Sequence, residues 1–300
     1  MNIDNPIIFL GLPRSGTTII SETIMRHKEL AFPSRYSNSY YKYPIINIFR
    51  NFFSNSLWEL RGEKKQLNQV SYLNKYLFKP SEAYKMWNYL TELDVDFSRN
   101  FLFNQIPTEK RKRIIRSYFK KIVKYQNKNR LAFKITGPSR IEYLLSIFPK
   151  AYFIHIKRDY IPTISSLLKV HFWKERGYSK LWWQGAYSDF EIQWAKEHRN
   201  DPISLTTFQL IKCQEILQSE IEKYNPNYLQ INYEDFIDNP EEIIKKILLF
   251  SDLSDYKFTD QFLRDLKIIN RNKSENDYFN ANELKKIKSI IDNRYLKNNS

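Results

Sequence analysis

Two patterns of apolar and polar positions alternate along the chain. In the first, a short run is continuously apolar or alternates in polarity, which is typical of strands in a sheet whose faces are covered. These runs occupy residues 6–10, 131–135, 151–156 and 227–232. In the second, apolar residues recur at intervals of three and four, which predicts helices with one buried face.

Predicted helices separate the predicted strands. They cover residues 19–25, 45–53, 67–77, 83–93, 109–125, 141–148, 162–168, 204–224, a segment ending at Phe250, and 282–295. Strands that alternate with helices are typical of α/β domains. The sequence therefore predicts an α/β fold with a short parallel sheet flanked by helices. A glycine-containing loop between the first strand and the first helix makes the fold P-loop-like.

That loop, residues 11–18, is the strongest chemical signal in the chain. Gly11 and Gly16 allow a tight turn, and the residues with hydroxyl groups are Ser15, Thr17 and Thr18. A helix that begins directly after such a loop directs free N–H groups and the positive end of its dipole at one point, which suits a phosphate. The glycine spacing is that of a nucleoside-triphosphate loop, but Thr17 stands where such loops have lysine. Arg14 can instead bind two oxygens of an anion.

Composition and length predict a single globular domain over residues 1–300, because 42% of the residues are hydrophobic and no repeat is visible. The one cysteine, Cys213, excludes an internal disulfide framework. We expect neither a signal peptide nor a membrane span, since no apolar stretch approaches ~18 residues. The expected location is the cytoplasm.

The net charge of +15 raises the question of an anionic partner. The basic runs at residues 110–113, 120–121 and 285–286 have the pattern of solvated helix faces. Aromatic residues do not interleave with these runs, which argues against a nucleic-acid partner. A multiply charged nucleotide or an acidic acceptor also explains the charge, and a polyanion-binding module is the non-enzymatic alternative.

The segment from Leu12 to Thr18, Leu-Pro-Arg-Ser-Gly-Thr-Thr, resembles the 5′-phosphosulfate loop of the sulfotransferase family, in the form found in its bacterial and tyrosylprotein branches. The resemblance implies sulfuryl transfer from 3′-phosphoadenosine 5′-phosphosulfate (PAPS), with Arg14, Ser15, Gly16, Thr17 and Thr18 binding the donor. It needs no metal. It also implies that residues 36–130 form a helical cap on the acceptor side.

Three further segments are similar to family motifs. Arg158 follows a strand and Ser166 lies eight residues later, as in the 3′-phosphate motif. Tyr-Glu-Asp at Tyr233 resembles the adenine-side motif, and Lys134 matches a strand-end lysine that contacts the transferred group. The segment from Asn270 to Ser274 resembles the C-terminal phosphate loop. That last match implies that Arg271 and Lys273 also bind the donor.

The resemblance to the family does not identify the general base. Thr136 stands where the cytosolic branch has histidine, and Arg35 stands near the place of the tyrosylprotein glutamate. Two candidates remain, Glu82 and His171. Glu82 is expected in the first turn of a helix capped by Ser81, where complementing the helix dipole explains the carboxylate better than a catalytic role does. His171 has a suitable ordinary pKa, but we favour Glu82 because acceptor-specific residues belong to the cap.

Two other features bear on function. His155 lies in mid-strand, an odd number of residues from Arg158, so we expect a buried core histidine rather than a base. Some of the aromatic residues from Phe172 to Trp194 are expected in the core, and the others would provide rings around a pocket. The predicted acceptor is therefore a hydroxyl of a small apolar or aromatic molecule such as a sterol, lipid or phenol. The alternatives are a saccharide hydroxyl, and, from another class, a P-loop phosphotransferase.

Overall fold

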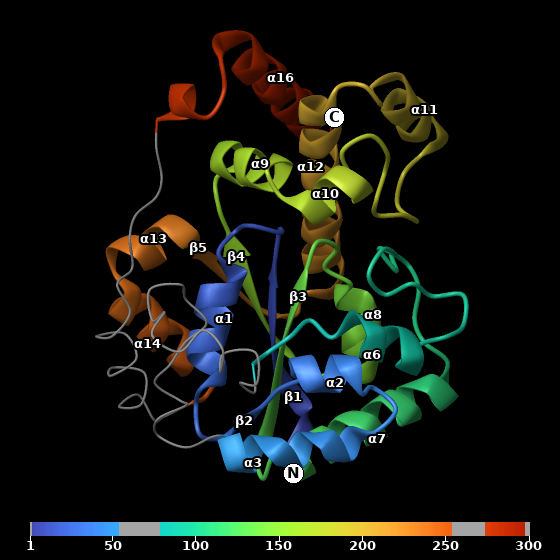
Figure 1. Cartoon of the computed structure of the whole chain (residues 1–300), viewed down its shortest axis with the longest axis vertical. Helices are drawn as coiled ribbons and strands as arrows, with labels where there is room; N and C mark the ends of the chain where they lie inside the picture. Colours follow the sequence, from blue (N-terminus) through green and yellow to red (C-terminus); the bar gives the residue numbers. More distant parts are fainter. Residues whose placement is uncertain (1, 54–78, 254–273, 298–300) are drawn as a thin grey trace.

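Five parallel strands form the centre of the molecule in the computed structural model, which describes residues 2–53, 79–253 and 274–297 (Figure 1). The strand order is β2-β3-β1-β4-β5. The strands are β1 (Asn2–Gly11), β2 (Leu30–Ala31), β3 (Arg130–Thr136), β4 (Tyr152–Lys157) and β5 (Asn227–Asn232). Four of the five match the predicted strands. The exception is β2, whose two residues are too few to give a pattern.

Helices cover both faces of the sheet and the carboxyl ends of its strands (Figure 1). The helices of the first three crossovers are α1 (Thr17–Met25), α2 (Arg35–Ser39), the 3-10 helix η1 (Pro44–Phe49), α3 (Arg50–Phe53), α6 (Tyr84–Leu90), α7 (Glu109–Tyr125) and α8 (Ile141–Ile147). Those that follow are α9 (Tyr160–Leu168), α10 (His171–Arg176), α11 (Asp189–Glu197), α12 (Pro202–Tyr224), α13 (Tyr233–Asp238), α14 (Pro240–Phe250), the 3-10 helix η3 (Glu275–Asp277) and α16 (Ala281–Lys297).

Alternate side chains of β1 enter two different cores. Ile8 and Leu10 point to the face covered by α7 and α8, whereas Ile7 and Phe9 point to the face covered by α1 and α14. All four side chains are at most 1% exposed. Burial on both faces explains why this strand is continuously apolar in sequence.

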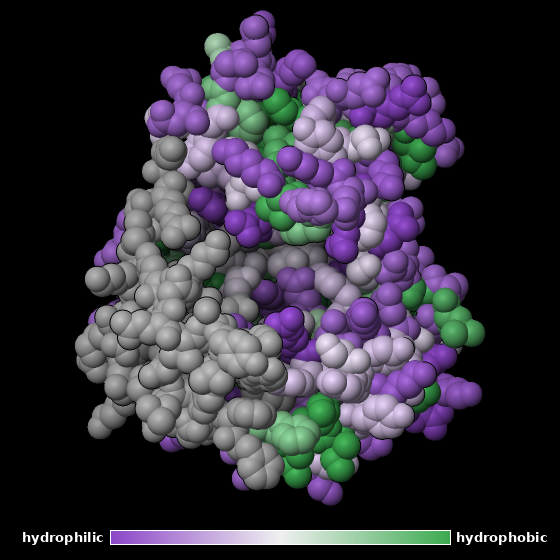
Figure 2. All heavy atoms as spheres, viewed as in Figure 1, coloured by the Kyte–Doolittle hydropathy of each residue, from purple (hydrophilic) through white to green (hydrophobic). Residues whose placement is uncertain are grey.

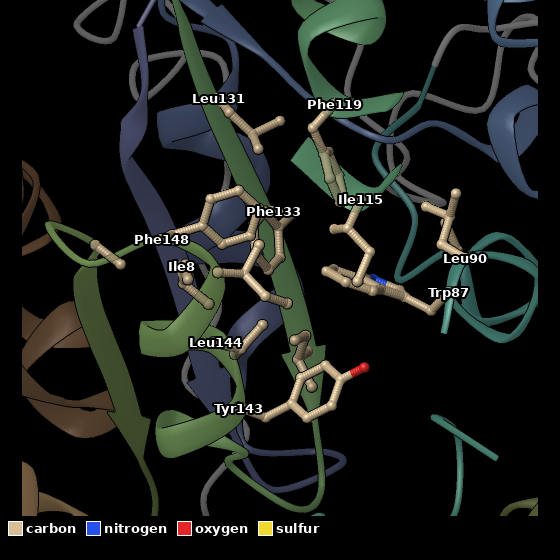
Figure 3. Packing of buried hydrophobic residues seen from close by; sticks show 14 of the residues in the cluster. Ile8, Trp87, Leu90, Ile115, Phe119, Leu131, Phe133, Tyr143, Leu144 and Phe148 are labelled. Carbon is tan, nitrogen blue, oxygen red and sulfur yellow. The ribbon is translucent and has the colours of Figure 1, made fainter. Parts of the chain in front are cut away.

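Aromatic rings join α6 and α7 to the first of these cores (Figure 3). Trp87 of α6 stacks on Phe97 with ring centroids 4.4 Å apart and an interplanar angle of 6°. Phe119 of α7 packs between Trp87 and Phe133 of β3, at 5.0 and 5.6 Å. These rings anchor the segment around residues 79–90 beside the sheet, at the edge where the strands end.

In this same segment the structure differs from what the sequence predicts. The helix predicted over 83–93 begins only at Tyr84 and ends at Leu90, and its N-cap is Ala83, with φ of 51° and no side-chain cap. Ser81 is therefore not the N-cap, and Glu82 precedes the helix instead of lying in its first turn. Residues 26–44, where the sequence predicts no helix, contain α2, which begins in a capping box between Ser34 and Ser37. The helix predicted over 67–77 lies outside the described residues.

His155 is a core histidine, as its place in the strand predicts. Its ring is 1% exposed, and Nδ1 lies 2.7 Å from the hydroxyl oxygen of Tyr228. Burial, helped by the charge of Lys157, lowers the pKa of His155 to about 4. The imidazole is therefore neutral at pH 7.

This lowered pKa predicts a loss of stability in acid. Between the ordinary pKa of histidine and about 4, the unfolded chain binds a proton that the folded chain does not, so the free energy of unfolding falls as the pH decreases through this window. The full loss from this group is about 3 kcal/mol, since one pKa unit corresponds to about 1.4 kcal/mol. Urea unfolding from pH 7 to 4.5 measures it. The matched variant His155→Gln should show a flatter profile, and an equal slope in both proteins would contradict this assignment.

Candidate functional site

The loop between β1 and α1 has a backbone shape that its glycines make possible. Gly16 has φ of 85°, and a Cβ placed on it would lie 2.1 Å from a ring carbon of Tyr233. A Cβ on Gly11 would lie 2.7 Å from the carbonyl oxygen of Ile156 and 2.5 Å from Cγ2 of Thr17. The close approach of β4 and α13 therefore requires glycine at both positions. Arg14 also has a positive φ, of 71°.

Donor groups at the start of α1 have no protein acceptor. The N-cap residue Gly16 supplies no side-chain cap, so the first N–H groups of the helix are open to an external anion. The Ser15 hydroxyl is buried, and it has no hydrogen-bond partner. A buried polar atom without a partner is costly unless a ligand satisfies it. The loop thus has the features of an anion-binding site.

Four side chains from three separate segments of the chain meet beside this loop. Arg14 Nε donates to Ser166 Oγ at 3.0 Å. Arg158 Nη1 donates to the carbonyl oxygen of Arg14 at 3.1 Å, and its Cζ lies 4.7 Å from the centroid of the Tyr233 ring. The structure therefore brings together the residues that the sequence assigns to a 5′-phosphate, a 3′-phosphate and an adenine.

A second group of side chains surrounds the end of β3. Lys134 Nζ donates to Thr18 Oγ1 at 2.9 Å and lies 3.6 Å from Glu82 Oε1. Thr136 Oγ1 donates to the same Glu82 oxygen at 2.9 Å. Glu82 is thus next to the strand-end lysine rather than at a helix N-terminus.

A cavity of about 350 Å³ opens at this group. Its lining residues are Thr18, Glu22, Asn38, Pro80, Ser81, Glu82, Ala83, Tyr84, Lys85 and Lys134. The cavity joins the loop helix α1 to the segment around residues 79–90, and most of its lining side chains are polar or charged. It is therefore a candidate site for a polar molecule next to the anion-binding loop.

Tyr84 holds one wall of the cavity in place. Its hydroxyl donates to the carbonyl oxygen of Thr136 at 3.0 Å. Burial, followed by the nearby Glu82 carboxylate, raises the pKa of Tyr84 well above its ordinary value. The phenol stays protonated at neutral pH, so Tyr84 fixes the end of β3 and does not act as a base.

The other predicted site residues lie elsewhere. His171 begins α10, where its side chain is 88% exposed and lies 3.5 Å from Glu175 Oε1; it does not line the cavity. Arg271 and Lys273 lie outside the described residues. Trp173 and Trp183, two of the rings expected around a pocket, are buried in a core with α9 and α12.

Sequence reasoning did not single out three polar residues of the cavity, Glu22, Asn38 and Lys85. Glu22 follows Thr18 by four residues, so the two lie on the same face of α1, and this spacing is the one signal that could have identified it. Asn38 reaches the cavity because α2 forms where no helix was expected. Its Oδ1 accepts from the backbone N–H of Lys85 at 2.9 Å, which joins α2 to α6.

Neither a metal cluster nor a membrane-spanning helix occurs among the residues that the structure describes. No group of three or more histidine, cysteine or acidic side chains there is arranged to hold a metal ion. No helix there combines the length and the apolar composition that crossing a membrane requires.

Comparison with known protein families identifies one family. A model described as the sulfotransferase family matches residues 6–257. Among solved structures, the chain is similar to the sulfotransferase STF9 from Mycobacterium avium, with a TM-score of 0.59, 15% identity, and coverage of 99% of this chain and 77% of that one. None of the curated proteins matches the chain significantly.

Two further structures align less closely. A sulfotransferase domain from the curacin biosynthetic pathway has a TM-score of 0.48 and 11% identity, covering 92% of this chain and 80% of that one. Retinol dehydratase in complex with retinol and PAP (adenosine 3′,5′-bisphosphate) has a TM-score of 0.40 and 13% identity, covering 98% and 82%. At these levels of identity the likeness concerns the fold alone.

Proposed function

The chain belongs to the sulfotransferase family, and from this premise we propose that it transfers a sulfuryl group from PAPS to a hydroxyl group held in the cavity beside Lys134. The observation that carries the proposal is the meeting of Arg14, Arg158 and Ser166 at the loop before α1. This arrangement offers separate donors for the two ends of a bisphosphorylated nucleotide.

The proposed mechanism assigns one task to each group of side chains. The bond between sulfur and the 5′-phosphate oxygen breaks while a bond forms between sulfur and the acceptor oxygen. Arg14, Lys134 and the free N–H groups of α1 stabilise the negative charge that grows on the leaving phosphate. Glu82 takes the acceptor's proton as general base. Thr136 donates to one Glu82 oxygen, which leaves the second oxygen to receive this proton.

The lining of the cavity bears on the acceptor. The sequence predicts a small apolar or aromatic molecule, with a saccharide as the alternative. Four charged side chains line the cavity, from Glu22, Glu82, Lys85 and Lys134, together with Asn38 and Ser81. Polar lining groups stabilise an acceptor that can form hydrogen bonds with them. An apolar acceptor would leave these lining groups without hydrogen-bond partners. Of the two acceptors, this lining favours the saccharide.

A P-loop phosphotransferase is the rival enzyme. Such an enzyme needs a lysine that reaches the outer phosphates, and a hydroxyl and an acidic side chain that hold magnesium. Thr17 occupies the place of that lysine, and Lys134 approaches the loop from β3 instead. The arrangement suits a nucleotide with one 5′-phosphate better than a triphosphate.

We expect strong discrimination between donors. Adenosine 5′-phosphosulfate lacks the 3′-phosphate, so it would leave Arg158 and Ser166 without their anion and should be a poor donor. One charge-assisted contact corresponds to about 1.5–3 kcal/mol, and hence to a ten- to hundred-fold lower kcat/KM. Transfer of radioactive sulfate to a panel of saccharides, phenols and sterols measures it for both donors.

Calorimetric titration with nucleotides is the control for this test. PAP should bind in the absence of metal, whereas ATP with magnesium should bind far more weakly. Equal kcat/KM for the two donors would overturn the assignment of the 3′-phosphate site, and tighter binding of ATP with magnesium would favour the phosphotransferase.

A further inference from the structure

Two arginines lie over one tryptophan ring, that of Trp182. The guanidinium carbons of Arg99 and Arg176 are each 4.7 Å from the centroid of the Trp182 ring. Arg176 also lies over Phe172, at 5.5 Å. We call these four residues the Trp182 cluster. Contact with the same Trp182 ring keeps the two guanidinium carbons within twice 4.7 Å of each other, because a cation is attracted to the face of an aromatic ring.

The charge of the Trp182 cluster is incompletely balanced within the part of the chain that the structure describes. No carboxylate there forms an ion pair with Arg176. Arg99 uses Nε to donate to the carbonyl oxygen of Trp182 at 3.2 Å. The Asp96 carboxyl interacts with the charge of Arg99: burial raises the pKa of Asp96, but hydrogen bonds from Ser98 and Asn88 and the charge of Arg99 together hold it below its ordinary value. The Asp96 oxygen Oδ1 already accepts from Asn88 and Ser98.

Backbone contacts connect the cluster to the end of β3. Gln184 N donates to the carbonyl oxygen of Arg99 at 3.0 Å, so the segments that carry Arg99 and Trp182 run side by side. The next ring, Trp183, lies against Gly137, where an added Cβ would be 2.8 Å from it. Gly137 directly follows Thr136, which binds Glu82. Figure 2 shows a hollow on this face between the region of α10 and the regions of α2 and α6.

We propose that Arg99 and Arg176, held by Trp182, form a subsite for an anionic group of the acceptor, such as a carboxylate or a sulfate on an acidic saccharide. The hydroxyl that receives sulfate would enter the cavity at Glu82 and Lys134, while the anionic group of the same molecule binds to the two guanidiniums. A guanidinium matches the oxygens of carboxylate and sulfate with pairs of N–H donors. The proposal rests on the proposed function, because the anion belongs to the acceptor.

The test compares matched probes that differ in one charge. The first pair is a hyaluronan tetrasaccharide and the same molecule with its carboxylates reduced to alcohols. The second is 4-hydroxyphenylacetate and its amide, which places the same anion on a phenol. Each probe is titrated calorimetrically into the protein with and without PAP, so that subsite binding is measured independently of the donor site. We expect at least one anionic probe to bind about tenfold or more tightly than its neutral counterpart.

Variants assign this preference to the cluster. The double variant Arg99→Gln/Arg176→Gln should lose the preference, while PAP affinity stays unchanged. The control Arg113→Gln removes one positive charge from the exposed face of α7 and should keep the preference. If the anionic and the neutral probe bind equally well in both pairs, the proposed subsite is wrong. It is also wrong if the double variant keeps the preference for the anionic probe. Failure of PAP to bind the wild-type protein would instead contradict the proposed function.

Discussion

Replacing Arg14 with alanine is expected to abolish sulfuryl transfer. Arg14 lies in the loop before α1 and donates through Nε to Ser166, which leaves its Nη groups for the leaving phosphate and the transferred group. Loss of one preorganised donor to a developing negative charge lowers kcat about 10²–10³-fold, or about 3–4 kcal/mol. Initial rates at saturating PAPS with any working acceptor measure this effect.

Arg158 provides the contrast. Its guanidinium lies between the Arg14 carbonyl oxygen and the Tyr233 ring, at the predicted 3′-phosphate. Arg158→Ala should therefore weaken PAP binding about ten- to hundred-fold, whereas kcat at saturating PAPS should fall less than in the Arg14 variant. Arg113→Ala, on α7, is the control for the loss of one positive charge. If Arg158→Ala binds PAP as tightly as the parent protein does, the assignment of the 3′-phosphate site is wrong.

The donor side of the site was predictable because its signals are local. A buried strand, a loop with two glycines and a helix follow one another within residues 6–25, and the backbone of such a segment directs N–H groups at an anion whatever lies around it. Arg158, Ser166 and Lys134 were predicted from their resemblance to family motifs, and the fold explains why they lie near one another. Each occupies the end of a parallel strand or the helix that follows it, and these ends meet at one edge of the sheet.

The acceptor side was not predictable in the same way, because its geometry depends on contacts between distant segments. Glu82 lies 52 residues from Lys134 and reaches it only because Trp87 and Phe119 anchor the neighbouring helices to the sheet. The sequence placed Glu82 in a helical first turn, but α6 begins later, at Tyr84. Helix propensity was overridden by the contacts of Glu82 and Tyr84 with Thr136.

These same contacts strengthen the case for Glu82 as the general base. If Glu82 lay in the first turn of a helix, its interaction with the helix dipole would be enough to explain a carboxylate there. Before the helix, it lines the cavity and lies 3.6 Å from Lys134, the side chain that binds the loop hydroxyl of Thr18. His171, the other candidate, has a largely exposed ring and does not line the cavity. Geometry therefore favours the residue that is beside the expected reacting atoms.

Glu82→Gln is accordingly expected to lose most of kcat while PAP affinity stays intact. Glutamine keeps an oxygen that can accept the hydrogen bond from Thr136, so the cavity should keep its shape, but it cannot take a proton from the acceptor. General-base catalysis contributes about 10²–10⁴-fold to the rate, and an ordinary alcohol depends on it because its own ionisation at neutral pH is negligible. Single-turnover rates with bound PAPS isolate this step from product release. His171→Asn is the matched control and should keep nearly the full rate. The reverse result would assign the base to His171, and unchanged rates in both variants would exclude both residues.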